Sequence, residues 1–213
     1  MNGEKAKNLY AKNILAAVLS AVIVTSLCAC RGGQNSSDGS VDAVSSVVED
    51  ASMQTLIDSN MDYLVEQSER FYNIYLRCNA ETEEYDYSLL AEDENGFKYA
   101  PVKEFSTISE LKAETEKYFT KEGAQKLFYD TALNGPIPYY KEQDGKLVVI
   151  ADYMSVGENK WVKGSAKITE ENKNTATVNV RYKDIYDLDK SADFSVVNDN
   201  GTLKITDILY NLK

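Results

Sequence analysis

Histidine is absent from this chain of 213 residues, which also has only three cysteines, three prolines and one tryptophan. Histidine is the commonest general base and metal ligand in proteins, so those roles would have to fall to other residues. A cysteine nucleophile paired with histidine is excluded. The three cysteines are too few for the four thiolates of a zinc cluster, and no glycine-rich phosphate loop occurs. We therefore expect no cofactor and no metal ion.

The N-terminus has the pattern of a secretory signal. Three lysines, at positions 5, 7 and 12, precede a nearly uncharged run over residues 14–29 that ends in small residues. The apolar core, residues 14–27, is too short to cross a hydrocarbon layer of about 30 Å comfortably. We expect residues 1–29 to be removed as a signal peptide.

The segment "LCAC", residues 27–30, resembles the cleavage site of bacterial lipoprotein signals. Those signals need an aliphatic residue three positions before the modified cysteine and a small residue directly before it. Leu27 and Ala29 meet this spacing for Cys30. Cys28 does not meet it, because the residue three positions before it is a threonine and the residue directly before it is a leucine. The resemblance implies a lipidated Cys30 and a chain anchored on the extracytoplasmic face of the cell membrane. An ordinary secretory signal and an uncleaved anchor are the alternatives.

The charge and composition after the signal indicate a linker followed by one acidic domain. Residues 30–52 are rich in Gly, Ser and Asp and can bury little, which favours a flexible, lipid-anchored linker before a folded domain at 53–213. The formal net charge of −11 makes nucleic acid and anionic lipid headgroups poor partners. A basic protein or a cationic ligand fits such a chain better, and acidity for solubility alone is the alternative.

Helices are predicted in the first half of the domain. Over residues 53–78, apolar residues recur at helical steps and predict one face of a long helix. These residues are Ile57, Met61, Leu64, Phe71, Tyr75 and Cys78, the last read as a small buried hydrophobe. Thr107 with Glu110 forms a capping box, and Thr120 with Glu122 begins a further helix.

Strands are predicted in the second half, after one short strand at residues 97–102. Three hairpins follow, the first turning at Asp144-Gly145. Their paired strands are residues 137–142 with 147–153, 161–170 with 175–184, and 192–197 with 202–211. Six strands at this spacing predict one curved antiparallel sheet covered by the helices, which is an α+β fold.

A glycoside hydrolase that uses two carboxylates stays an alternative function. Acidic residues are so numerous here that finding two at a suitable spacing does not identify such an enzyme. Tyr and Asp combine at residues 84–87, 152–155 and 184–190, a composition typical of contact surfaces, although each can be an ordinary loop. Asp184, Asp187 and Asp189 faintly resemble a calcium loop, but the turn glycine and terminal glutamate of an EF-hand are missing.

The order of four segments resembles the IseA family of DL-endopeptidase inhibitors, over residues 53–213. The segments are "EFSTISELKAETEKYFTKEGAQKLF", "DGKLVVIADYMSVGENKWVKGSAKIT", "TATVNVRY" and "NGTLKITDI". Proteins of this family are exported by Gram-positive bacteria and block NlpC/P60 autolysins, the cysteine peptidases that cut peptidoglycan stem peptides. Similar strings occur in lipoproteins with cystatin-like or NTF2-like folds.

The resemblance implies a monomeric inhibitor without enzymatic activity, whose protruding loop fills the cleft of an NlpC/P60 endopeptidase. The corresponding stretch here is "ADYMSVGENKW". Asp152, Gly157 and Glu158 match the inhibitory loop of the family in residue character. The apolar residues expected to enter the cleft of the enzyme are Tyr153, Met154 and Val156. A hairpin loop without a partner is the alternative at this site. A ligand- or protein-binding envelope lipoprotein without activity is the alternative function.

Overall fold

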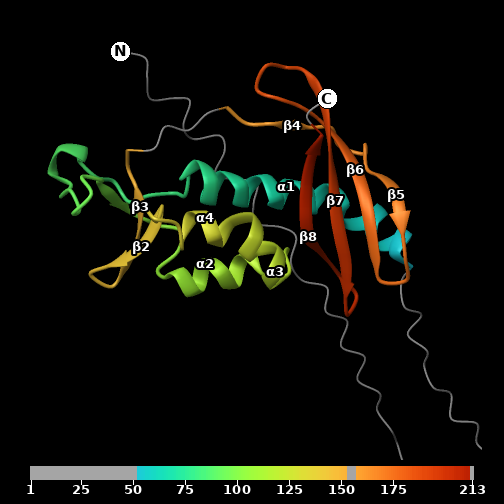
Figure 1. The fold of residues 1–213 in the computed structure, drawn as a ribbon, viewed down its shortest axis with the longest axis horizontal. Coiled ribbons are helices and arrows are strands. Elements are labelled where there is room, and N and C mark those ends of the chain that lie inside the picture. Colours follow the sequence, from blue (N-terminus) through green and yellow to red (C-terminus); the bar gives the residue numbers. More distant parts are fainter. Residues whose placement is uncertain (1–51, 153–156, 212–213) are drawn as a thin grey trace, which may run out of the picture. The chain divides into compact units, whose positions relative to one another are not determined.

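A computed structural model describes residues 52–152 and 157–211, which belong to one compact unit, Val47–Lys213. The predicted signal peptide, Cys30 and the linker up to residue 51 lie outside the described residues. Helices pack on a curled antiparallel sheet, so the predicted α+β class is confirmed (Figure 1).

The long helix α1 (Met53–Arg77) forms as its apolar spacing predicts. The Oγ atom of Ser52 accepts a hydrogen bond from the Thr55 amide at 3.2 Å and caps the first turn. The five predicted apolar positions from Ile57 to Tyr75 are each at most 3% exposed. Cys78 ends the helix in a left-handed conformation, φ 54°, and is only partly buried. Burial raises the pKa of its thiol to about 12.

Both predicted helix starts are confirmed. The Thr107 hydroxyl accepts a hydrogen bond from the Glu110 amide at 3.1 Å, and the Glu110 carboxylate accepts one from the Ser106 amide at 2.8 Å. The Thr120 hydroxyl accepts from the Gly123 amide at 3.1 Å. The helical segments that follow are α2 (Ile108–Thr115), α3 (Lys121–Ala124), the π-helical η2 (Gln125–Tyr129) and α4 (Asp130–Ala132).

The larger sheet has five strands in the order β4-β6-β7-β8, and β5 pairs with β6. They are β4 (Lys160–Trp161), β5 (Lys167–Glu171), β6 (Thr175–Lys183), β7 (Asp189–Asp199) and β8 (Thr202–Asn211). Because β7 occupies one edge of β6, β4 and β5 share the other edge, one near each end. The predicted turn between β7 and β8 forms with positive φ at Asn200 (53°) and Gly201 (87°), as a type I′ hairpin requires.

The prediction of a single six-stranded sheet is wrong. The first hairpin, β2 (Tyr140–Gln143) and β3 (Lys146–Ile150), joins β1 (Tyr99–Pro101) in a separate sheet of order β1-β3-β2. The reason lies in β3, where four consecutive residues, 147–150, are buried. Leu147 and Val149 face the main core, whereas Val148 and Ile150 pack in a small cluster on the other face. β3 thus differs from β6 of the larger sheet, whose buried residues alternate with more exposed ones along the strand.

The predicted strand 161–170 is also wrong, because it is interrupted between β4 and β5. Gly164 takes a φ of +66°, a conformation that glycine adopts without strain. Its amide donates to both carboxylate oxygens of Asp62 on α1, each at 3.0 Å. The helix therefore holds the turn that breaks the strand.

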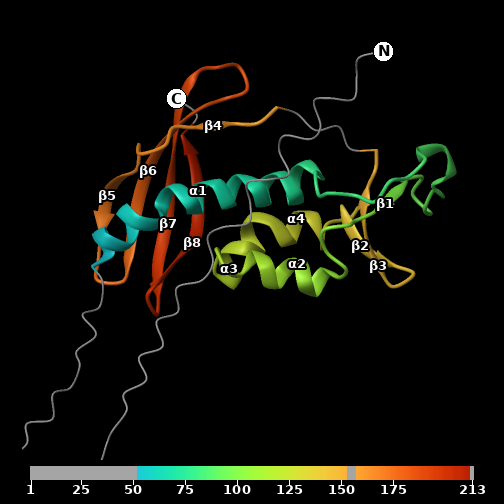
Figure 2. The same cartoon turned by 180° about the vertical axis from the view of Figure 1, so that it is seen from behind.

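One core connects the two sheets through the helices. Helix α1 contacts β8, η2 and α4, while α3 packs against β8 and α2 against β2. Figure 2 shows the two sheets at opposite ends of the described unit, with the shorter helices between them. No helix among residues 52–152 and 157–211 has the length and apolar character needed to cross a membrane.

Candidate functional site

The structure describes both ends of the loop that the sequence singles out. Asp152 follows β3, and Gly157 and Glu158 precede β4. All three are exposed. Tyr153, Met154 and Val156 lie outside the described residues.

Asp152 is held by two donors from the segment that precedes β1. Its carboxylate accepts a hydrogen bond from the Tyr87 hydroxyl and another from the Lys98 amide, the latter at 2.9 Å. The hydrogen bond from Tyr87, together with that from Lys98, lowers the pKa of the Asp152 carboxyl. The charge of Asp152 is thus fixed in place at the first end of the loop.

The second end of the loop is joined to α1 by a continuous chain of side-chain hydrogen bonds. Trp161 Nε1 donates to Glu69 Oε2 at 3.0 Å, and Arg77 Nη1 donates to Glu69 Oε1 at 3.0 Å. The same Arg77 nitrogen also donates to Asn73 Oδ1. Asn73 Nδ2 in turn donates to Glu158 Oε1 at 3.0 Å. Glu158 is therefore tied to the helix.

Helical spacing explains why these three side chains of α1 meet the same segment. Residues 69, 73 and 77 are each four apart and so lie on one stripe of the helix. The Glu69 and Arg77 side chains are only 11% and 7% exposed. A buried ion pair of this kind is sustained only when further hydrogen bonds satisfy its atoms, which Trp161 and Asn73 provide.

Aromatic packing fixes Trp161 as well. Its ring lies 4.9 Å from the ring of Tyr182 and 5.4 Å from that of Phe194, measured between centroids. Tyr210 completes the group at 6.3 Å. Rings at these separations attract one another beyond the area they bury. The end of β4 is thereby anchored against the larger sheet.

A cleft of about 330 Å³ opens between α1 and the segment after β4. Charged and polar side chains of α1 and of Lys163 line it together with the apolar side chains of Val65, Trp161, Val162 and Val180. The charged and polar residues are Asp62, Glu66, Glu69, Arg70, Asn73 and Lys163. Lys163 and Glu66 form an ion pair at 2.6 Å between two lining residues. The alternative of a ligand-binding lipoprotein predicts a pocket lined by Tyr and Phe between helix and sheet, and among the described residues neither type lines this cleft.

A short apolar turn lies beside the second end of the loop. We call residues 184–188, between β6 and β7, the hairpin tip. Ile185, Tyr186 and Leu188 are 46%, 77% and 55% exposed. The Asp184 carboxylate holds the turn by accepting from the amides of Tyr186 and Leu188 at 2.9 and 3.0 Å. A Cβ placed on Gly157 would lie 3.5 Å from Ile185 Cγ2, so loop end and tip are neighbours.

The acids of the hairpin tip are engaged within the protein. Asp184 caps its own turn, and Asp187 lies 3.4 Å from the Lys183 ammonium group. Asp189, the first residue of β7, lies 3.8 Å from the same group. No cluster of three or more metal-ligating side chains occurs among the described residues.

The Tyr and Asp segment at residues 84–87 lies beside the first end of the loop, through the contact of Tyr87 with Asp152. Tyr85, Tyr87 and Leu89 are exposed there, Leu89 to 82%. Exposed apolar side chains therefore flank both ends of the loop, although they come from distant parts of the sequence.

The hydrogen-bonded stripe of α1 was not predicted from the sequence. A Glu, an Asn and an Arg spaced by four have the composition of a solvated helix face. In the structure Glu69 and Arg77 are buried, and Trp161 donates a hydrogen bond to Glu69. The single tryptophan next to the proposed loop was the available signal, because a large aromatic side chain is seldom left in solvent.

A scan against models of known protein families gives no match to this chain, and a search of curated proteins gives none either.

Proposed function

We propose that the chain is an extracytoplasmic lipoprotein that binds and inhibits NlpC/P60 cell-wall endopeptidases through the loop that begins at Asp152 and ends at Glu158. The chain itself performs no catalysis in this proposal. Its contribution is a surface that occupies the active-site cleft of the enzyme, with Tyr153, Met154 and Val156 as the apolar residues that the sequence predicts to enter.

One observation carries the proposal: both ends of the loop are fastened to the body of the protein. Asp152 is held by Tyr87 and Lys98, and Glu158 is held by Asn73. Fixing the ends of a binding segment lowers the conformational entropy lost on association, which favours tight binding. The exposed apolar side chains beside each end add surface of the kind that anchors protein interfaces.

The alternative function, a ligand-binding envelope lipoprotein, has one observation in its favour. An open hollow of about 520 Å³ lies beside the three-stranded sheet. Its apolar lining consists of Phe97, Pro136, Ile137, Tyr139 and Ile150. An apolar small molecule is the ligand that such a lining would take.

Affinity measurements on matched variants test the loop directly. Residues 30–213 with Cys30→Ser would be titrated calorimetrically against purified NlpC/P60 endopeptidases. Asp152→Asn should weaken binding at least about tenfold if the carboxylate faces the cationic Cys/His pair of the enzyme, because close charge pairs contribute a few kcal/mol.

Tyr87→Phe is the control for Asp152→Asn. It removes the hydroxyl that binds Asp152 and keeps the negative charge. Equal losses in both variants would show that Asp152 acts only by holding the loop. Unchanged affinity in Asp152→Asn would contradict the charge contact, and binding of an apolar small molecule without binding of any endopeptidase would favour the alternative.

A further inference from the structure

The segment before β1 presents the most exposed of the large apolar side chains among the described residues. We call residues 84–94 the acidic tip. Leu89 is 82% exposed, and Tyr85 and Tyr87 are 42% and 46% exposed. Leu89 and Tyr87 belong to the single helical turn η1 (Tyr87–Leu89). Figure 1 shows this segment in green at the end of the unit opposite β5.

The acidic tip is a built structure, because several of its polar groups hold the backbone. Asp86 Oδ1 accepts from the amide and hydroxyl of Ser88 at 2.9 and 2.7 Å, which fixes the turn η1. Asp93 Oδ1 accepts from the amides of Asn95 and Phe97 at 2.9 and 3.0 Å. Lys98 Nζ lies 4.5 Å from the centroid of the Tyr87 ring. The hydrogen bonds of Asp86 thus hold the turn that carries Leu89.

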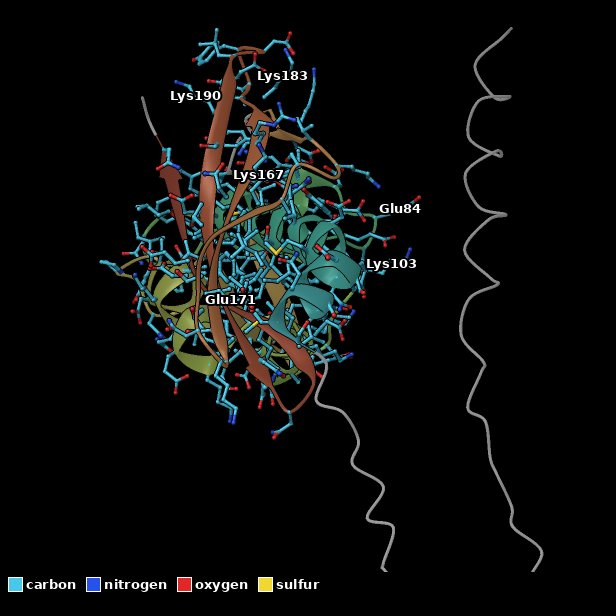
Figure 3. All side chains as sticks on the ribbon, turned by 90° about the vertical axis from the view of Figure 1, so that its right-hand side faces the viewer. Glu84, Lys103, Lys167, Glu171, Lys183 and Lys190 are labelled. Atoms are coloured by element: carbon cyan, nitrogen blue, oxygen red, sulfur yellow. The ribbon has the colours of Figure 1, made fainter. Side chains whose placement is uncertain are left out.

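The acids of this region divide into two groups. Glu81, Glu83 and Asp93 are paired with lysines, at 2.5 Å with Lys103, 3.0 Å with Lys146 and 3.1 Å with Lys141. Glu84, Glu92 and Glu94 are exposed and make no ion pair among the described residues. In Figure 3, Glu84 lies at the same side of the view as Lys103, apart from Glu171 of β5. Three glutamates without an ion pair among the described residues therefore stand in the same short segment as the exposed apolar residues, close to them in sequence.

We infer that the acidic tip is a docking surface for a basic protein. The partner's surface would carry lysine or arginine side chains around an apolar depression that receives Leu89. Complementary charge selects this occupant, since three free carboxylates attract a cationic surface and repel an anionic membrane. The inference goes beyond the proposed inhibition, because it holds for a basic partner of any activity. Among the described residues, the acidic tip adjoins the loop only through the contact of Tyr87 with Asp152, and neither Leu89 nor the three free glutamates belong to the loop.

Site-specific photocrosslinking in the full-length chain, in cells that produce it, tests the inference. A benzophenone amino acid would replace Leu89 in one strain and Leu209, which is 64% exposed on β8, in a control strain. We expect crosslinking to one protein from position 89 alone, and that protein should have a basic surface. The triple variant Glu84→Lys, Glu92→Lys, Glu94→Lys should lower the yield at least about tenfold, and added salt should lower it too.

A second triple variant controls for net charge. Glu122→Lys, Glu170→Lys and Glu171→Lys make the same change at exposed positions away from the acidic tip and should leave the yield unchanged. Equal loss in both triple variants, equal yields from positions 89 and 209, or crosslinks to lipid alone would each overturn the inference. Inhibition of an endopeptidase can succeed or fail independently of these results.

Discussion

At the scale of single residues, Glu69 connects the helix to the candidate site. Its two carboxylate oxygens bind different partners, Arg77 and Trp161, and little of the side chain meets solvent. Removing one member of a buried ion pair leaves the other charged and unpaired, which costs far more than losing an exposed pair.

Glu69→Ala should therefore lower the free energy of unfolding by about 3–5 kcal/mol. Glu66→Ala, one turn away on α1, should lower it by at most about 1 kcal/mol, because its pair with Lys163 is exposed on both sides. Urea unfolding followed by tryptophan fluorescence measures both. Similar losses in the two variants would contradict the role assigned to Glu69.

Buried tyrosine hydroxyls predict a loss of stability at high pH. Burial, with the nearby Glu116 carboxylate, raises the pKa of Tyr129 from 10.0 to about 12. At pH values between these two, the folded state keeps the Tyr129 hydroxyl proton, whereas the unfolded chain loses it. The stabilisation is complete below pH 10 and is lost as pH rises towards 12.

Unfolding measured across this range should show the free energy of unfolding falling with pH, and Tyr129→Phe should make the fall less steep. One part of the rise in phenolate absorbance, that of the buried tyrosines, should occur only when the protein unfolds. Complete titration of every tyrosine near pH 10 in the folded protein would be the opposite result.

At the scale of elements, the sequence predicted the helices, caps and turns that depend on the periodicity of apolar residues and on local turn residues. The face of α1, the caps at Thr107 and Thr120 and the Asn200-Gly201 hairpin follow from local patterns. The assignment of the strands to two sheets does not follow from local patterns, because it depends on the side chains that cover the second face of β3. The break before β5 depends on Asp62, which is about a hundred residues away in sequence.

Gly123 tests the contact between α3 and β8. A Cβ there would lie 2.8 Å from the carbonyl oxygen of Thr206 and 3.0 Å from that of Ile205. Gly123→Ala should destabilise the protein by about 1–3 kcal/mol, because backbone must move to relieve the overlap. Thermal unfolding measures this change.

Gly157→Ala is the matched control, because among the described residues its added Cβ would meet the Ile185 side chain alone, at 3.5 Å, an ordinary contact. Its melting temperature should stay close to that of the wild type. A Gly123→Ala protein as stable as Gly157→Ala would show that the packing of α3 on β8 is looser than described.

At the scale of the whole molecule, the candidate site joins parts that no sequence window contains. Asp152, Gly157 and Glu158 were predicted as contact positions of the loop, but the hydrogen bonds of Asp152 with Tyr87 and of Glu158 with Asn73 were not predicted. Side-chain contacts between a helix and a distant loop leave no local pattern in the sequence. The sequence also did not predict which apolar residues lie exposed beside the two ends of the loop, because their positions depend on the folded chain.

The lipid anchor is tested by fractionation. Cys30→Ala should release the protein from membranes, since Leu27 and Ala29 fit the lipoprotein signal only for that cysteine. Cys28→Ala should leave it membrane-bound. Identical fractionation of both variants and the wild type would contradict the assignment of Cys30.

Inhibition of a cell-wall endopeptidase is the property on which the proposed function depends most. The decisive measurement is the rate at which purified NlpC/P60 endopeptidases cleave peptidoglycan stem peptides, with and without residues 30–213 carrying Cys30→Ser. We expect a micromolar excess of this protein to suppress cleavage by at least one such enzyme, and Asp152→Asn to suppress it less. Undiminished cleavage by several of these endopeptidases at that excess would show that the protein is not their inhibitor.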